Sequence, residues 1–376
     1  MSLHELTDEQ RATRELARRF ADEVVAPQAP EWDREHRFPR ELFGRLGELG
    51  LMGVCVPAEH GGAGADYLAY VLVLEELSRA DAGVGVTVAV HTGAGTLPIV
   101  AHGSGEQVER LVPPLAGGDE LAAFALTEAE AGSDAAALRT AVRDGRVTGA
   151  KQWITNGSHA DVVVVFARDE DDRVGAHLVR RGAPGFAAVR EEDKLGLNSS
   201  STADLAFEET PAERLGEPGA GLRIALATLD GGRIGIAAQA TGVAQAALDL
   251  ASGYAGERRA FGRPIGGFQA IQHRLADMQT EIEAARALTW RAARLKAAGR
   301  PHTVEGAQAK LFASGVARRQ TGEAIQVLGG YGYTKEFPAE RYYRDAKVTE
   351  IYEGTSEIQR LVIARALLGE AAGDGL

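Results

Sequence analysis

The chain has 376 residues, of which 45% are hydrophobic and 25% charged, and 53 acidic against 41 basic residues give a formal net charge of −12. This length allows two or three packed units, since single hydrophobic cores stop growing near ~250–300 residues, and the composition is typical of a globular protein. The acidic balance argues against a surface for DNA or RNA, so we expect no nucleic-acid partner, and any anionic ligand must meet a local basic patch.

The chain contains one cysteine, Cys55, which excludes an internal disulfide and a multi-cysteine zinc or iron–sulfur centre. The nine histidines show no spacing typical of metal ligands, so we predict no metal site. Charges are spread through residues 1–14, where a signal peptide needs an apolar core, and we expect no uncharged run to approach the ~20 residues that span a bilayer. We therefore expect no membrane segment and a cytoplasmic protein.

The first third of the chain has helical signals. Thr7 and Gln10 form a capping-box pattern, apolar residues then recur every four positions, and Pro27 ends the run. Residues 67–77 are apolar almost all round, as expected of a helix buried inside a bundle. We predict an N-terminal α-helical domain over residues 1–122.

The middle of the chain has strand signals. Asp144-Gly145 between two β-prone runs predicts a hairpin, because this dipeptide tolerates the positive φ of a type I′ turn. Further short β-prone runs, separated by Gly, Pro and charged residues, cover residues 161–166, 176–179, 185–189 and 203–207. We predict a small β domain, barrel-like or a sandwich, over residues 123–225.

Helical periodicity returns from about Gly221. The clearest helical pattern is a row of apolar residues spaced three and four apart, and Gly299 and Pro301 mark the end of this helix. The row consists of Phe268, Ile271, Leu275, Met278 and Ile282. Such a stripe suits packing within the chain or against a helix of another subunit, and we keep both alternatives. The predicted fold class is thus α+β, with a C-terminal four-helix-bundle domain over residues 226–376.

Two segments of the β domain suit a flat ligand. In residues 124–134, small residues let the backbone approach a ring, and Thr127 and Ser133 offer hydroxyls; a Ser/Asp helix cap is the alternative. In residues 151–157, Trp153 and Thr155 share one face if the segment is a strand; a cross-strand aromatic before an Asn-Gly turn is the alternative.

Two segments of the C-terminal domain suit phosphate groups. Residues 254–264 gather three arginines in an acidic chain, and arginine forks bind phosphate bidentately; a solvated helix end paired with Glu257 is the alternative. Residues 326–333 end a helix predicted over 303–328 and expose glycine amides, although a double glycine is often only a C-cap.

A fifth segment, residues 351–360, contains Glu353 between Tyr352 and Gly354. Apolar surroundings raise the pKa of a carboxyl toward neutrality, and a glycine would let a substrate carbonyl approach the backbone amide. Both features suit a base that removes an α-proton. The alternative is that the Glu353 carboxylate caps the next helix.

Taken in this order, the five segments resemble the acyl-CoA dehydrogenase family over essentially the whole chain, most closely in residues 254–278 and 351–360. The resemblance implies the domain order helical, β, helical. It implies FAD between the β domain and the C-terminal helices, with electrons passing to an electron-transfer flavoprotein. It also implies a homotetramer, because residues 326–330 match a segment that a neighbouring subunit contributes.

The resemblance assigns roles residue by residue. The catalytic base is Glu353, which would remove the pro-R α-proton as the β-hydrogen leaves as hydride, giving a trans-2-enoyl-CoA. The acyl-CoA positions are Ser133, Asp230, Arg233, Tyr352 and Gly354. The FAD positions are Phe124, Leu126, Thr127, Gly132, Ser133, Trp153, Ile154, Thr155, Arg258, Phe261, Gln269, Gln326, Val327, Gly329, Gly330, Thr355 and Glu357.

Three positions depart from the family pattern. Ala129 replaces a common proline, which predicts a less rigid flavin loop. Leu197-Asn198 replaces aromatic or basic residues, and Gly232 stands where some members carry their base, which leaves Glu353 as the base candidate.

Two other functions share much of this pattern. An acyl-CoA oxidase performs the same half-reaction but commonly carries a long C-terminal extension. A non-catalytic acyl-CoA-binding relative should tolerate loss of the base, whereas Glu353 and its flanks are intact. The dehydrogenase is therefore favoured, while the acyl chain and the pathway stay open, with a short or branched acyl group as our guess.

Overall fold

A capping box opens the first helix of the computed structural model, which describes residues 5–372. The Thr7 hydroxyl accepts from the Gln10 amide at 3.1 Å, and the Gln10 side chain accepts from the Thr7 amide at 2.9 Å, as predicted. The N-terminal helices are α1 (Asp8–Phe20), α2 (Ala29–Glu35), α3 (Arg40–Glu48), α4 (Tyr67–Ala80), α5 (Ala82–Val88), α6 (Leu97–His102) and α7 (Gly105–Ala116), with π-helical turns at Ala21–Val25 and Ala89–Thr96.

One stretch of this domain is long and apolar enough to cross a membrane by length and composition, namely Ala82–His102. The expectation that no such stretch exists was wrong, because the glycines, threonines and histidines of this stretch carry no formal charge. In the structure, 83% of its most apolar window is buried inside the protein. It therefore serves as a core segment, next to α4, whose residues are nearly all buried as predicted.

The middle domain is an eight-stranded sheet in the order β6-β7-β3-β2-β4-β5-β8, with β1 paired in parallel to β4. Its strands are β1 (Ala122–Ala125), β2 (Ala141–Arg143), β3 (Arg146–Thr155), β4 (Val162–Arg168), β5 (Val174–Arg180), β6 (Phe186–Glu191), β7 (Thr202–Pro211) and β8 (Glu213–Leu215). The predicted hairpin is present, since β2 pairs with β3 and both Asp144 and Gly145 have positive φ.

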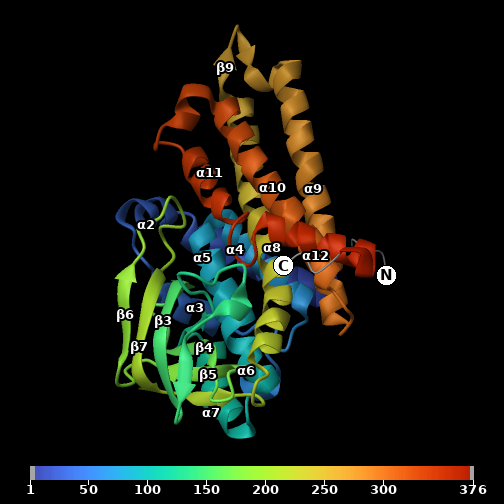
Figure 1. Ribbon diagram of the computed structural model, residues 1–376. Helices are drawn as coiled ribbons and strands as arrows, with labels where there is room; N and C mark the ends of the chain where they lie inside the picture. Colours follow the sequence, from blue (N-terminus) through green and yellow to red (C-terminus); the bar gives the residue numbers. More distant parts are fainter. Residues whose placement is uncertain (1–4, 373–376) are drawn as a thin grey trace.

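Five helices follow: α8 (Gly221–Glu257), α9 (Gln269–Ala297), α10 (Thr303–Leu328), α11 (Ala339–Val348) and α12 (Ser356–Leu368). The helices α8, α9 and α10 contact one another, and α11 contacts α8 and α10. A two-stranded hairpin, β9 (Arg259–Ala260) and β10 (Arg263–Pro264), joins α8 to α9 at the end farthest from the sheet (Figure 1). The predicted order of helical, β and helical domains is thus confirmed, and the boundaries at 122 and 225 stay predictions.

Helix α8 connects two hydrophobic cores. Its first turns, with Ile224 and Ala225, belong to a cluster that includes strands β4 and β5, whereas Ile234 and later residues belong to the large helical core. The stripe predicted on α9 divides in the same way: Met278 and Ile282 are buried, while Ile271 and Leu275 toward the hairpin are only partly buried. The far end of the C-terminal helices thus keeps apolar surface accessible.

Candidate active site

Glu353 lies in a tight turn between α11 and α12. Its φ is +53° and that of Gly354 is +87°, so two consecutive residues have left-handed backbone. The next residue, Thr355, caps α12 by accepting from the Ile358 amide at 3.3 Å. Because Thr355 supplies the cap, the alternative that the Glu353 carboxylate caps this helix is wrong, and the carboxylate is free for another use.

The Glu353 carboxylate rests against α8 at Gly232. A Cβ at Gly232 would lie 2.4 Å from Glu353 Oε2, so only glycine leaves room for the carboxylate in this position. Within the described residues, Oε2 is buried without a hydrogen-bond partner. Burial raises the pKa of Glu353 to about 7, opposed by the positive charges of Lys310 and Arg233, which confirms the raised pKa expected from the flanking residues.

Two cations lie near this carboxylate, but each is engaged elsewhere. The Arg233 guanidinium contacts Asp230 at 2.6 Å, and Lys310 Nζ donates to the Gly354 carbonyl at 2.5 Å. Among the described residues, neither cation forms an ion pair with Glu353 within 4.0 Å. The structure therefore brings together Asp230, Arg233, Tyr352, Glu353 and Gly354, which the resemblance assigns to the acyl-CoA and the base.

Tyr352 closes the space beside Glu353. Its hydroxyl donates a short hydrogen bond to the Gln239 side-chain oxygen on α8, and Gln239 is fully buried. Burial raises the pKa of Tyr352, so its hydroxyl keeps its proton. This bond therefore joins the segment that carries Glu353 to α8, at a residue two helical turns after Gly232.

The two predicted ligand-facing segments of the β domain lie side by side. The Gln152 amide donates to the Thr127 carbonyl at 2.9 Å, and the buried Lys151 donates to the Leu126 carbonyl at 2.9 Å and to Glu128 at 2.7 Å. Glu128 also accepts from the amides of residues 139 and 140 at 2.7 and 3.0 Å. These bonds tie down the loop, despite the alanine at position 129.

Trp153 does not occupy a regular strand position. The pairing of β3 with β7 shifts register between Lys151 and Ile154, and Trp153 has a φ of +61°. As a result 56% of Trp153 is exposed, while Ile154 enters the core of the β domain. The Asn156-Gly157 turn is present, but Asn156 is fully buried and donates to two backbone carbonyls, so this turn also anchors the sheet to α5.

These residues fit a flat cofactor such as FAD. The large Trp153 ring is exposed next to a loop in which Gly132 and Ser133 are exposed, and a Cβ at Gly132 would meet nothing within 4 Å. Asp134 precedes a short 3-10 turn at Ala135–Ala137 without a side-chain cap, so the alternative of a helix-capping Ser/Asp loop does not hold for Asp134. Phe124, Leu126, Thr127, Trp153, Ile154 and Thr155 thus belong to one surface region, with Leu126 and Ile154 buried beneath it.

A second group of predicted cofactor residues lies far from the first within one chain. Arg258 stacks over the Tyr331 ring at 5.6 Å, which joins the hairpin after α8 to the Gly329–Tyr333 turn after α10. Figure 1 shows this end of the helices well away from the sheet. The arginine-rich segment is a hairpin rather than a helix end paired with Glu257, and Gly329 does cap α10. This group consists of Arg258, Phe261, Gln269, Gln326, Val327, Gly329 and Gly330.

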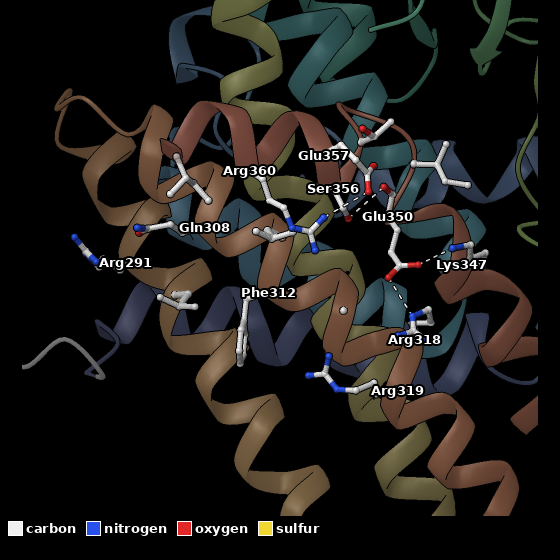
Figure 2. Close-up of a pocket in the computed structure, with 16 residues that line it drawn as sticks. Arg291, Gln308, Phe312, Arg318, Arg319, Lys347, Glu350, Ser356, Glu357 and Arg360 are labelled. Carbon is white, nitrogen blue, oxygen red and sulfur yellow. Dashed lines mark hydrogen bonds and ion pairs between the residues drawn. The ribbon is translucent and has the colours of Figure 1, made fainter. Parts of the chain in front are cut away.

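A cavity of about 980 Å³ near the turn is lined by residues of α9, α10 and α12 and of the segment that joins α11 to α12 (Figure 2). Thr355 and Glu357 line it, and they are the two predicted FAD positions on this helix. Around them Arg318 and Lys347 both point to Glu350, at 3.1 and 2.7 Å. The cavity lining therefore mixes apolar side chains, such as Leu311 and Phe312, with cations that are each paired with a carboxylate.

Family models match almost the entire chain. The acyl-CoA dehydrogenase N-terminal domain matches residues 7–119, the middle domain residues 123–210 and the C-terminal domain residues 219–368. The chain belongs to the acyl-CoA dehydrogenase family. The FAD-dependent oxidoreductase activity predicted from the sequence is thereby confirmed.

Similar proteins include several acyl-CoA dehydrogenases. The short-chain specific acyl-CoA dehydrogenase of Bos taurus mitochondria is 50% identical, covering 97% of this chain and 91% of that protein. The short-chain specific enzyme of Clostridium acetobutylicum is 46% identical over 96% of this chain and 98% of that protein. The butyryl-CoA dehydrogenase structure from Megasphaera elsdenii has a TM-score of 0.94 at 43% identity, covering 97% of this chain and 99% of that chain.

A further solved structure, described as the electron transferring flavoprotein of Acidaminococcus fermentans, contains a chain with a TM-score of 0.95 and 44% identity. It covers 97% of this acyl-CoA dehydrogenase and 99% of that chain.

Sequence reasoning missed several residues that shape this dehydrogenase site. Lys310 and Gln359, which hold the Gly354 carbonyl, were not singled out, nor was Gln239. For Lys310 a signal existed, because it is a lone charge on an otherwise apolar helical face, Ala307 to Ala313. Such a lysine is usually interpreted as a surface residue whose stem covers apolar atoms.

Proposed function

We propose that this acyl-CoA dehydrogenase acts on short-chain acyl-CoA thioesters, with Glu353 as the base. The observation that carries the proposal is a buried carboxylate, Glu353, whose Oε2 has no hydrogen-bond partner among the described residues and whose pKa is raised to about 7. A base is most effective when its pKa lies near the working pH. An α-proton next to a thioester is a weak acid, so an ordinary carboxylate would remove it poorly.

The surrounding residues support this role. Glu353 removes the α-proton, and a thioester oxygen that accepts from the Glu353 backbone amide would be stabilised as negative charge develops on it. Tyr352 and the α8 backbone keep water from the carboxylate, which maintains its basicity. Bound FAD supplies the acceptor for the β-hydride, and Phe124, Thr127, Trp153, Thr155, Thr355 and Glu357 are the residues of this chain that would hold it near the base.

The geometry beside Glu353 supports a short acyl tail. The carboxylate lies at Gly232 on α8, and the Tyr352–Gln239 bond crosses from the turn to the same helix seven residues later, about 10 Å along its axis. For a tail that runs from Glu353 along α8 toward Gln239, a few carbons would stop before this buried bond and a long tail would have to displace it. The short-chain specificity in the names of the Bos taurus and Clostridium relatives supports the same substrate class.

We further propose a homotetramer that passes electrons to an electron-transfer flavoprotein in the cytoplasm. One group of predicted cofactor residues lies on the β domain, and the other lies at the far end of the C-terminal helices, near the β9–β10 hairpin (Figure 1). The hairpin end of one subunit would therefore complete the FAD site of another. The Acidaminococcus structure named for an electron transferring flavoprotein supports the electron acceptor. The only cysteine in the sequence, the half-buried and unpaired Cys55, suits a reducing compartment.

The test is anaerobic bleaching of the flavin band by a panel of acyl-CoAs from four to sixteen carbons, roughly the span that separates short from long tails. We expect butyryl-CoA to bleach fastest and Glu353→Gln to slow bleaching by about 10²–10⁴-fold. Equal bleaching by Glu353→Gln would contradict the base, and preference for long tails would contradict the substrate class. Reoxidation by dioxygen as fast as by an electron-transfer flavoprotein would favour the oxidase alternative.

A further inference from the structure

A buried lysine lies beneath the turn that carries Glu353. Lys310 on α10 has no solvent exposure, yet its Nζ donates to the Gly354 carbonyl at 2.5 Å. Burial lowers the pKa of Lys310 to about 8, even though the negative charge of Glu353 opposes this shift. An apolar side chain of similar length would fill the space without burying a charge, so the ammonium at this position calls for an explanation beyond packing.

The turn needs external support. A residue other than glycine with left-handed backbone costs about 1–2 kcal/mol, and such a conformation persists only when its surroundings enforce it. Two donors from different helices meet on the Gly354 carbonyl: Lys310 Nζ from α10, and Gln359 Nε2 from α12 at 2.8 Å. Together they fix the Gly354–Thr355 peptide, and Gln359 Nε2 also donates to the Glu353 carbonyl at 3.3 Å. The two peptides that follow Glu353 are therefore held, and with them the direction of its side chain.

The position of Lys310 also affects the electrostatic environment of the Glu353 carboxylate. A direct ion pair would lower the pKa of a carboxylate by about 1–3 units and occupy the lone pair that must accept the α-proton. Lys310 avoids this, since its hydrogen bond goes to a carbonyl, and the neighbouring Arg233 is committed to Asp230. The carboxylate therefore experiences positive charge from both sides while its oxygens stay available.

We propose that Lys310 is a positioning residue for the dehydrogenation: its ammonium holds the Gly354 carbonyl, which fixes the turn that presents Glu353, and places positive charge near the carboxylate without pairing with it. This inference rests on the proposed role of Glu353 as the base.

The experiment compares three methionine variants of the flavoprotein. Lys310→Met removes the donor and the charge, and Gln359→Met removes the second donor to the same carbonyl but no charge. Lys194→Met is the matched control, because Lys194 also donates to a backbone carbonyl, that of Ser200 at 2.9 Å, but in the loop after β6. The measurement is kcat/KM for butyryl-CoA per bound flavin, followed across pH with a dye as electron acceptor.

We expect kcat/KM to fall about tenfold or more in Lys310→Met and in Gln359→Met, because both loosen the turn. Only Lys310→Met should move the rising limb of the pH profile to higher pH, since the lost cation no longer lowers the pKa of Glu353. Lys194→Met should match the wild type. The titratable and charged groups that interact electrostatically with Glu353 are Tyr67 and Tyr70 on α4, Arg233 on α8, Lys310 on α10 and the adjacent Tyr352. Beyond these, Asp230 pairs with Arg233, and Glu350 and Glu357 interact with Lys310.

A stability measurement tests the same coupling without turnover. Glu353→Gln should raise the Tm at about pH 8 by more in the Lys310→Met background than in the wild type, because an ionised buried carboxylate is less stable without the nearby cation. Equal Tm gains in both backgrounds, or an unmoved rising limb in Lys310→Met, would overturn the inference. Full activity in Glu353→Gln would instead overturn the proposed base.

If Lys310→Met does not fold into a flavoprotein, a second variant, Lys310→Arg, tests the same inference. Lys310→Arg keeps the charge, so the rising limb should stay in place. Its larger forked side chain should displace the Gly354 carbonyl and lower kcat/KM about tenfold or more. A rising limb in Lys310→Arg that moves to higher pH, as expected for Lys310→Met, would contradict the role of the charge.

Discussion

At the scale of single residues, the buried charge of Glu353 makes folding stability depend on pH. Its folded-state pKa is raised to about 7 from an ordinary value of 4.5. Below pH 4.5 the carboxyl is neutral in both states, and above about pH 7 the folded protein buries a charge that the unfolded chain exposes. Stability associated with this group is therefore lost as pH rises through this window.

We accordingly expect Glu353→Gln to be more stable than the wild type above about pH 7, by at most about 3 kcal/mol, and no more stable near pH 4.5. Calorimetric Tm values of the two flavoproteins across this range check the prediction. A difference in Tm that does not vary with pH would show that the carboxylate is not desolvated in the folded protein.

Gly232 offers a second test at this scale. Gly232→Ala places a Cβ where Glu353 Oε2 now lies, at 2.4 Å, so the carboxylate must move and kcat should fall about tenfold or more. Gly253→Ala is the matched control on the same helix, because its Cβ would meet nothing within 4 Å. That variant should keep full activity and gain about 0.5–1 kcal/mol from the better helix propensity of alanine. Equal activity of both variants would argue that Glu353 is placed differently.

The sequence predicted Glu353 as the base, the role proposed for it here, but not the residues that support its turn. The aromatic and glycine neighbours of Glu353 suited a base, and the resemblance over the whole chain assigned it that role. Lys310 lies 43 residues earlier on another helix, and only the packing of α10 against the turn shows what its ammonium meets. Such contacts between distant segments carry no local signal.

At the scale of secondary-structure elements, a buried ionic network joins the N-terminal and C-terminal helices. Glu75 on α4 has 3% exposure and accepts from Arg286 on α9 at 2.7 Å, while Arg286 also donates to Gln245 on α8 at 2.8 Å. The adjacent Glu76 accepts from Arg14 on α1 at 2.7 Å. Four helices thus depend on two neighbouring carboxylates.

Removing one partner should leave a buried charge uncompensated. We expect Arg286→Met to destabilise the protein by about 3–5 kcal/mol. Disrupting the exposed pair of Arg37 with Glu41 by Arg37→Met should change stability by less than about 1 kcal/mol. Urea unfolding of both variants provides the comparison. Similar small effects would mean that helix packing alone holds α4 against α9.

Element bounds could be predicted where the determining signal is local. The Asp-Gly turn and the glycines after α10 mark their elements within a few residues. Trp153 could not be placed correctly by alternation, because the bulge that exposes it depends on the register of β3 against β7, about 50 residues away. The sequence therefore indicates a strand that ends before the Asn156-Gly157 turn, but not which way its aromatic side chain faces.

At the scale of the whole molecule, the order of the three domains follows from composition along the chain, whereas the distance between the two groups of cofactor residues does not. Helix α8 alone extends about 55 Å and carries the hairpin away from the sheet (Figure 1). The proposed homotetramer would bring the two groups together by placing the hairpin of one copy beside the β domain of another.

Phe261 at the tip of the hairpin tests this arrangement. It is 94% exposed, with a φ of +49°, and its ring contacts only the edge of Phe268 among the described aromatic rings. A large apolar side chain held so far from the body indicates a partner surface. Phe261→Ser should therefore reduce the tetramer in sedimentation velocity and lower the flavin bound per chain. Val189→Ser is the control, because Val189 is also an exposed hydrophobic residue, at 61%, but lies on β6. If Phe261→Ser keeps both the tetramer and the flavin, the hairpin does not complete the site of a neighbouring subunit.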